Sequence, residues 1–289
     1  MSKGSLFWAN ASGKLGESVF YRAGGEQRNR TYVKNIKNPK TKAQMSNRIQ
    51  MLNLTTIFKE LADILRVSFP NRSSKESGFN AFVKANKSAT SSVNLKSNLD
   101  RGIVAPYQYF ISKGDLILPQ PSVITTKTGT QVYGYEMSDG RDKDENSNAW
   151  FGLLVRDLGL PVGTKVTIVK GRYVDEGWKL GYAIYDSAFV ATEPILKGES
   201  IEVTVDTVGD DLTGNVLSFG ESNDADLLAV IFSYTDANGK LKVNTAQLRA
   251  MTANGISTAS EDFQGPDGFV YEQVLEAYGY NQDSALSSR

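Results

Sequence analysis

The first part of the chain, residues 5–33, consists of short apolar bursts separated by glycines. The bursts are Leu6-Phe7-Trp8, Ser18-Val19-Phe20-Tyr21-Arg22 and Thr31-Tyr32-Val33. Gly13, Gly16 and the pair Gly24-Gly25 separate them, and glycine readily adopts the positive φ angles that tight turns require. We therefore expect short strands joined by tight turns. So few apolar residues cannot enclose a core, so this segment is expected to dock on something else as an arm or hairpin.

Ser12-Gly13-Lys14 resembles the end of a phosphate-binding loop, but the motif fails at two positions. Its first glycine should stand five residues before Gly13, where this chain has Trp8. A serine or threonine should follow the lysine, where this chain has Leu15. The segment is therefore expected to form a turn and not a nucleotide site.

A long helix is expected to follow the arm. Pro39 keeps Asn38 out of the helical region of backbone conformation. Thr41 and Gln44 then form a capping box, which satisfies free backbone amides at a helix start. The pattern predicts a helix from residue 41 to about Val67.

The apolar residues of this predicted helix fall on two stripes. Met45, Ile49 and Leu52 form the first stripe. The second stripe lies about half a turn away around the helix and consists of Leu54, Ile57, Phe58, Leu61 and Leu65. Two explanations remain open: the helix breaks around residues 53–56 with both halves in one core, or its first half packs on a partner subunit.

A second capping box, Ser73-x-x-Glu76, predicts a helix that ends near Lys87. Its apolar face would consist of Phe79, Phe82 and Val83. The two helices would form a helical hairpin. A polar connector over residues 88–98 should follow it.

The rest of the chain has the spacing of an antiparallel β domain. Strand-sized apolar bursts lie at residues 131–137, 150–155, 165–173, 178–185, 200–205, 215–219, 227–234 and 240–244. Asp236-Ala237-Asn238-Gly239 should close a hairpin between the last two, and a short helix is expected over residues 269–278. The predicted fold class is α+β: an extended arm (1–40), a helical hairpin with its connector (41–104) and a β-sandwich-like domain (105–289).

The composition narrows the functional classes. The chain of 289 residues contains no cysteine and no histidine. Thiol nucleophiles, thiolate metal sites, histidine-ligated metals and a Ser-His-Asp triad are therefore excluded. The N-terminus lacks the apolar core of a signal peptide, and no apolar run reaches membrane-spanning length. We expect a non-enzymatic protein of the cytoplasm, or of a particle assembled there, without a cofactor and without a membrane partner.

Two acidic clusters are candidates for chemistry. Asp142, Asp144 and Asn146 have the spacing of a calcium loop, but Ser147 and Leu153 replace its glycine and its glutamate, so a solvated turn is expected over residues 139–145. The pairs at positions 210–211 and 224/226 contain carboxylates such as glycosidases use. Nothing in the surrounding sequence would raise the pKa of one member of these pairs, so we expect no catalytic residue among them.

Charge is distributed unevenly along the chain although the net charge is zero. Residues 1–104 carry 18 Lys or Arg and 6 Asp or Glu, whereas residues 105–289 carry 14 and 26. The basic end could contact nucleic acid or the acidic end of a neighbouring copy. We favour assembly, because the basic segment lacks the arginine density of a dedicated nucleic-acid binder.

Two motifs in this region carry a resemblance. The first is Ser12-Gly13-Lys14-Leu15-Gly16, followed by the strand Val19-Phe20-Tyr21; the second is Asn38-Pro39-Lys40-Thr41, continued by Gln44 and Arg48. The pattern Ser-Gly-Lys-x-Gly, then Asn-Pro-x-Thr-x-x-Gln-x-x-x-Arg, resembles a protein group of Bacteroidetes genomes and their phages. Members of this kind in crAss-like bacteriophages are virion components. The resemblance covers about residues 7–50 and assigns no catalytic residue.

The resemblance implies a virion structural protein, assembled in the host cytoplasm. We expect a ring or viral tail subunit at the head–tail connector region, which forms a cyclic homo-oligomer and contacts other virion proteins. The expected oligomer interface consists of Phe7, Trp8, Val19, Phe20, Tyr21, Tyr32, Met45, Arg48, Ile49 and Leu52. The alternative is a nucleic-acid-associated protein that contacts phosphates through Arg22, Arg28, Arg30, Lys34 and Lys37.

Overall fold

In the computed structural model, the chain divides into two compact units between Thr41 and Lys42. The structure describes residues 12–23, 26–34, 42–87, 96–104, 108–137, 147–174, 177–187, 195–197, 203–208, 214–221 and 226–251. The first two of these ranges belong to the first unit and the others to the second. The helix predicted over 269–278 and the acidic loop 139–145 lie outside the described residues.

The first unit contains a small antiparallel sheet of three strands in the order β1-β2-β3. The strands are β1 (Gly13–Leu15), β2 (Ser18–Ala23) and β3 (Glu26–Thr31). Leu15 pairs with Ser18 across a two-residue turn, in which Gly16 has a φ of 59° that glycine adopts without strain. The strands and tight turns expected from the glycine spacing are present here. None of the side chains described in this sheet is buried.

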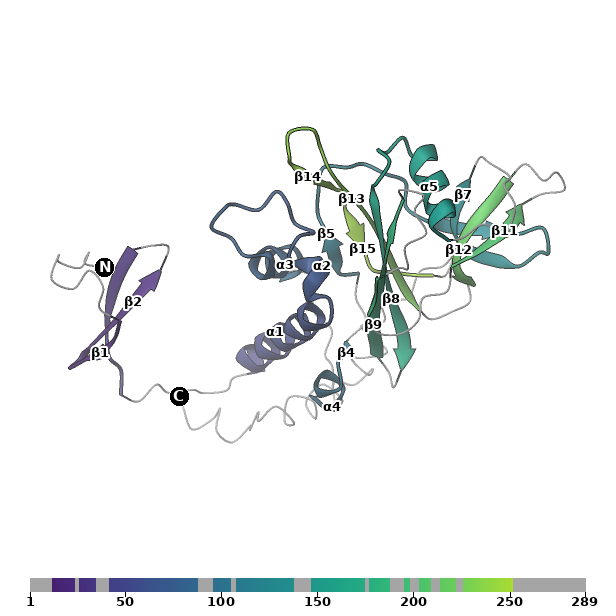
Figure 1. Cartoon of the computed structure of the whole chain (residues 1–289). Helices are drawn as coiled ribbons and strands as arrows, with labels where there is room; N and C mark the ends of the chain where they lie inside the picture. The colour runs from purple at the N-terminus through teal and green to yellow at the C-terminus, as the bar shows by residue number, and fades with distance from the viewer. Residues whose placement is uncertain are drawn as a thin grey trace. The chain divides into compact units, whose positions relative to one another are not determined.

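The second unit is organised around a large antiparallel sheet whose main path runs β10-β9-β8-β13-β14 (Figure 1). Its strands are β8 (Lys165–Val174), β9 (Gly177–Asp186), β10 (Ile195–Lys197), β13 (Leu227–Thr235) and β14 (Leu241–Val243). Two short strands extend it, β4 (Ile103–Val104) beside β9 and β16 (Arg249–Ala250) beside β13. The hairpin predicted between β13 and β14 is confirmed, because the Gly239 amide donates to the Asp236 carbonyl and the two strands pair.

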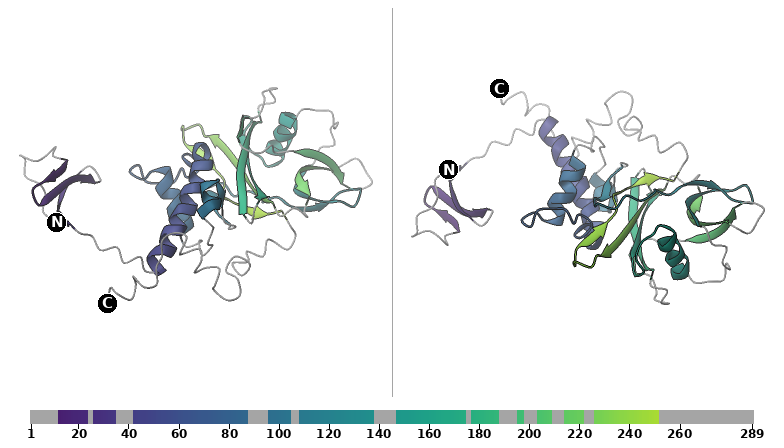
Figure 2. Two further views of the ribbon diagram at one scale, coloured as in Figure 1. Left: turned by 90° about the horizontal axis from the view of Figure 1, so that it is seen from below. Right: turned by 90° about the horizontal axis from the view of Figure 1, so that it is seen from above.

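Both faces of this large sheet are covered. Along β13, Leu227, Ala229 and Ile231 belong to one apolar core, and Leu228, Val230 and Phe232 belong to another. Side chains alternate between the two faces of a strand, so the unbroken apolar run of β13 serves two layers at once. Helices α1, α2 and α3 supply the first core, and α5 together with a second sheet supplies the other (Figure 2).

The helical layer consists of α1 (Lys42–Glu60), α2 (Ala62–Leu65) and α3 (Gly78–Asn86). The helix α1 is shorter than the predicted helix, which was expected to run to Val67. It ends at Glu60 because the φ of −112° and ψ of 24° at Leu61 are not helical. The capping box at Thr41 lies partly outside the described residues. The connector predicted over 88–98 also overlaps a short helix, α4 (Lys96–Asp100).

The start of α3 corrects the second capping-box prediction. The helix begins at Gly78, and its N-cap is Ser77, whose hydroxyl accepts a hydrogen bond of 3.2 Å from the Asn80 amide. Ser73 forms a turn instead, in which its carbonyl accepts from the Glu76 amide. The sequence Ser-x-x-Glu describes a turn as well as a helix start, and here a second serine closer to the apolar residues caps the helix.

The apparent change of face within α1 has a simple explanation. Met45, Ile49, Asn53, Ile57 and Leu61 are four residues apart and are all buried. Each step of four residues turns the row by about 40° around the helix, so the two ends of one row face different directions. Asn53 fills the polar position of the row, and its side-chain amide donates to the buried hydroxyl of Tyr109. The helix therefore continues through residues 53–56 without a break.

The second sheet of this unit has four antiparallel strands in the order β11-β12-β7-β6. They are β6 (Ser122–Thr125), β7 (Gln131–Met137), β11 (Thr204–Val208) and β12 (Gly214–Glu221). Side chains of β7 and β12, such as Tyr135 and Phe219, face the large sheet across a shared core. The predicted α+β class with two facing antiparallel sheets is therefore confirmed.

One predicted strand, over residues 150–155, is wrong. The segment belongs to α5 (Ser147–Asp157), and all its side chains from Trp150 to Val155 are buried. Trp150, Phe151 and Leu154 pack into the core between the two sheets. A helix that is buried on all sides shows no amphipathic period, so its apolar run could not be distinguished from a buried strand.

A small two-stranded sheet joins the helical layer to the β region. It pairs β5 (Phe110–Ser112) with β15 (Ala246–Gln247). Asn86, at the end of α3, donates to the Phe110 carbonyl at 3.0 Å and accepts from the Phe110 amide at 2.8 Å. Its side chain thus reproduces the hydrogen bonds of a neighbouring strand. Together with the shared core, this pairing makes the helical hairpin and the β strands parts of one unit.

Candidate docking surfaces

The register of the small sheet sorts its side chains onto two faces. Lys14 pairs with Val19, Val19 with Arg30, and Tyr21 with Arg28, and side chains of paired residues share a face. We call this the basic face; its described side chains are Lys14, Val19, Tyr21, Glu26, Arg28 and Arg30, with Tyr32 directly after β3. The reverse face consists of Gly13, Leu15, Ser18, Phe20, Arg22, Gln27, Asn29 and Thr31.

The basic face combines cations with aromatic rings. The ammonium of Lys14 lies 3.7 Å from the centre of the Tyr32 ring, a cation–π contact that places both on the same face. Arg28 forms an ion pair of 3.7 Å with Glu26, and both partners are exposed. Exposed pairs of this kind are worth well under about 1 kcal/mol. The guanidinium groups of this face are therefore available to a stronger anionic partner.

The reverse face carries the apolar side chains that the small sheet leaves open. Leu15 is 53% exposed, and Phe20 is half-buried. Gly13 pairs with Phe20, so no side chain stands opposite the Phe20 ring on β1. Leu15 and Phe20 are diagonal neighbours across the two strands, which makes a small apolar patch.

The expected oligomer interface is distributed over several surfaces. Val19, Tyr21 and Tyr32 lie on the basic face, and Phe20 lies on the reverse face. Phe7 and Trp8 lie outside the described residues.

The part of the expected interface on α1 needs a correction. Met45 and Ile49 are buried within the chain, 2% and 1% exposed, so they offer no surface to a partner. Leu52 is 45% exposed and adjoins Met51, which is 41% exposed. Arg48, one turn earlier, is also exposed. The outward face of α1 therefore keeps Arg48 and Leu52 as candidate contacts.

The alternative set of phosphate contacts is also divided by the register. Arg28 and Arg30 share the basic face, whereas Arg22 lies on the reverse face, where it pairs with Gln27. Lys34 is exposed just after the sheet, and Lys37 lies outside the described residues. The basic face also includes Lys14, which the sequence did not single out. Only the strand register could have identified it.

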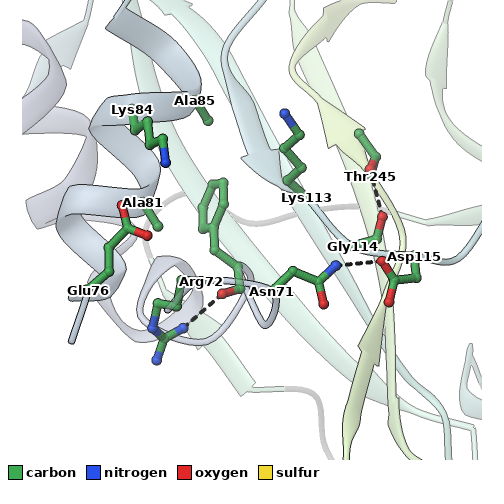
Figure 3. A pocket seen from close by; sticks show the side chains of 11 residues that line it. Asn71, Arg72, Glu76, Ala81, Lys84, Ala85, Lys113, Gly114, Asp115 and Thr245 are labelled. Atoms are coloured by element: carbon green, nitrogen blue, oxygen red, sulfur yellow. Dashed lines mark hydrogen bonds between the residues drawn. The ribbon is translucent and has the colours of Figure 1, made fainter. Parts of the chain in front are cut away.

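A pocket of about 510 Å³ lies in the second unit between α3 and the strand region (Figure 3). Its lining residues are Phe69, Asn71, Arg72, Glu76, Ala81, Lys84, Ala85, Lys113, Gly114, Asp115 and Thr245. Arg72 donates to the Phe69 carbonyl at 3.0 Å, and Asp115 forms an ion pair of 3.7 Å with Lys240. Lys84 and Lys113 stand on different walls and can bracket a small anionic group.

The carboxylates considered for catalysis do not form a site among the described residues. Asp226 forms an ion pair of 3.2 Å with Lys170, and it also accepts from the Tyr173 amide at 3.1 Å. Asp226 therefore links the start of β13 to β8. Asp224 and the pair at 210–211 lie outside the described residues, as does the loop 139–145. No cluster of three metal-ligating side chains occurs in the part of the chain that the structure describes.

Several tyrosines of the second unit have shifted pKa values. Burial raises the pKa of Tyr133, Tyr135 and Tyr185 above the usual value of a phenol. For Tyr182, burial and a hydrogen bond of 3.0 Å to Asp63 raise the pKa. These phenols stay protonated near neutral pH. Two of them donate hydrogen bonds: Tyr182 to Asp63, and Tyr135 to the Pro119 carbonyl at 3.2 Å.

Comparison with known proteins gives no family for this chain. No family model matches it, and neither a curated protein nor a solved structure is significantly similar to it. Across the described ranges, the structure contains no helix that is both long enough and apolar enough to cross a membrane.

Proposed function

We propose that this protein is a non-enzymatic structural component of a bacteriophage virion, assembled in the host cytoplasm. It would be a ring or tail-associated subunit at the head–tail region, in a cyclic homo-oligomer. The observation that carries the proposal is the small sheet of the first unit, in which no described side chain is buried. A three-stranded sheet without a core is marginally stable in water, so it gains stability by packing on another surface.

The surface that the small sheet packs on is assigned to a neighbouring copy. The basic excess of residues 1–104 and the acidic excess of residues 105–289 make the chain complementary to itself in a head-to-tail arrangement. The apolar patch of Leu15 and Phe20 supplies an uncharged centre for the contact. Arg48 and Leu52, on the outward face of α1, would form a second contact. The resemblance of residues 7–50 to phage virion proteins supports the same assignment.

Removal of the small sheet tests this proposal directly. A chain that lacks residues 2–37 should stay folded, because every described residue in the cores of the second unit lies after the deleted segment. It should be monomeric, whereas the full chain should form a closed oligomer of defined native mass. Native mass spectrometry or light scattering measures the difference. An oligomer of unchanged mass after the deletion would refute the model.

A point variant locates the contact more closely. Leu15→Asp places a charge in the apolar patch and should dissociate the oligomer at micromolar concentration. Ile117→Asp is a matched control, because Ile117 is 97% exposed and belongs to no proposed contact. The control variant should assemble like the unmodified chain. Equal loss of assembly in both variants would mean that solubility, and not the patch, is responsible.

A further inference from the structure

We propose that the basic face of the small sheet binds single-stranded nucleic acid. This inference does not rest on the assembly proposal, whose specific contacts are the apolar patch on the reverse face and the outward face of α1, although that proposal also uses the overall basic excess of residues 1–104. The two faces of one thin sheet can therefore contact different partners. Three features of the small sheet favour such binding: the cations of the basic face, its aromatic rings, and the separation of both from the reverse face.

The cations form one cluster across all three strands. The register places Lys14 on β1 beside Val19 on β2, and Val19 beside Arg30 on β3. Arg28 lies on the same face two residues from Arg30, about 7 Å along the strand. Arginine binds phosphate through two parallel hydrogen bonds, so two arginines and a lysine on a flat surface suit a chain of phosphates. Two described carboxylates accompany these cations: Glu26 contacts Arg28 through a weak exposed pair, and Glu17 stands opposite Tyr32, whose amide donates to the Glu17 carbonyl.

The aromatic rings distinguish a single strand from a duplex. Tyr21 lies on the basic face directly opposite Arg28, and Tyr32 follows at the end of β3. Tyr32 is 38% exposed and already receives the Lys14 ammonium on its ring. Unpaired bases stack on aromatic side chains that stand beside cations, whereas the bases of a duplex are stacked on each other. A sheet face with both features therefore fits a single strand.

Arg22 provides an internal control. It belongs to the same sheet and has the same charge as Arg30, but it lies on the reverse face. A general electrostatic attraction would use both arginines equally. Binding at the basic face would use Arg30 and not Arg22.

The test is a salt titration of binding by the full-length chain. A fluorescein-labelled oligothymidylate of about 16 nucleotides, the upper end of known site sizes, serves as the probe in fluorescence anisotropy. For single strands the logarithm of the affinity falls with the logarithm of salt concentration by about 0.7 for each phosphate contact. Three cations predict a slope of about −2. Arg30→Gln should reduce the slope by about 0.7, and Arg22→Gln should leave it unchanged.

The tyrosines should affect affinity without affecting the salt dependence. Tyr32→Ala should weaken binding by roughly tenfold, because it removes a stacking ring but no charge. Tyr32→Phe keeps the ring and should bind like the unmodified chain. Unchanged binding by this variant would also show that the sheet folds when residue 32 is replaced. Glu26→Gln should strengthen binding, since it removes the anion beside Arg28.

Several results would overturn the proposal. No binding at low salt would do so, as would an equal change of slope for Arg22→Gln and Arg30→Gln. Tighter binding of a duplex of the same length would exclude the single-strand assignment. Equal competition by a glutamate polymer would show that the face binds acidic protein segments instead. Retained binding by a chain that has lost oligomer formation through Leu15→Asp would separate this inference from the assembly proposal.

Discussion

The small sheet of the first unit and the large sheet of the second unit have similar strands but different surroundings. Both are antiparallel, and β2 contains a short apolar run, Val19-Phe20-Tyr21, as the strands of the large sheet do. The large sheet is covered on both faces by helices and by a second sheet, whereas no described side chain of the small sheet is buried. An apolar run therefore predicts that a strand forms, but not what covers it. The covered sheet supports the fold, and we propose that the small sheet binds partners.

The largest expected effect concerns the covered sheet. Phe232 on β13 is fully buried in the core between the two sheets. Phe232→Ala removes its ring and leaves a cavity, which should lower the free energy of unfolding by about 3–5 kcal/mol. Urea titration followed by tryptophan fluorescence measures this change. A loss below about 1 kcal/mol would mean that the second unit is packed no better than the small sheet.

The next effect concerns the polar position within the helical layer. The Asn53 amide donates to the buried Tyr109 hydroxyl, and Asn53→Ala leaves that hydroxyl without this partner. The expected loss of stability is about 1.5 kcal/mol, because a buried hydrogen bond is lost. The double variant Asn53→Leu with Tyr109→Phe makes both positions apolar and should recover most of the loss. Additive losses in the double variant would contradict a direct interaction between the two side chains.

A third effect is the pH dependence of the covered region. Burial, with a smaller contribution from Tyr133, raises the pKa of Tyr135 above its unfolded value of 10.0. A group whose folded pKa is raised stabilises the protein fully below the unfolded pKa, and this stabilisation is lost as pH rises through the folded pKa. Between neutral pH and pH 11 the unfolded phenol ionises while the folded one does not, which costs about 1.4 kcal/mol. Tyr135→Phe should show less loss of stability than the unmodified chain over this range in urea titrations.

A smaller effect tests the start of α3, which covers the large sheet. Ser77 caps the helix through the Asn80 amide, so Ser77→Ala should cost about 1 kcal/mol. Ser73→Ala is the matched control and should change the free energy of unfolding by less than about 0.5 kcal/mol. A larger loss for Ser73→Ala than for Ser77→Ala would mean that the capping box predicted at Ser73 and Glu76 is correct.

The sequence predicted the long strands of the second unit, but it missed short ones such as β5 and β6 and could not predict what lies between the sheets. Residues 227–234 form a strand as expected, because their β-branched and aromatic residues favour one. Residues 150–155 have a similar apolar run and form a helix, since full burial removes the period that would distinguish the two. The hydrophobic pattern of α1 predicts a change of helix face near Asn53, because such a pattern does not count a polar residue as part of a buried row. The partner of Asn53, Tyr109, is 56 residues away in the chain.

The candidate surfaces depended on register in the same way. The sequence grouped Arg22 with Arg28 and Arg30 because all three are close together in the chain. A strand turns alternate side chains to opposite faces, and the pairing of β2 with β3 places Arg22 away from the other two. Lys14 joins them although it lies 14 residues before Arg28. The face of a sheet is set by hairpin length and pairing, which composition does not encode.

The smallest expected effect concerns Phe20, the phenylalanine of the small sheet, which we compare with Phe232 of the large sheet. Phe20 is half-buried in a unit separate from the second, so Phe20→Ala should change the unfolding free energy of the second unit by less than about 0.5 kcal/mol. The chain has three tryptophans, and a Trp8→Phe background leaves only Trp150 and Trp178, both in the cores of the second unit. Their fluorescence then reports that unit alone, at concentrations low enough to keep the chain monomeric.

The Phe20→Ala variant should also weaken oligomer formation, because Phe20 belongs to the apolar patch. A loss of stability as large as that of Phe232→Ala would mean that the small sheet is packed on the second unit of its own chain and is not open to a neighbour.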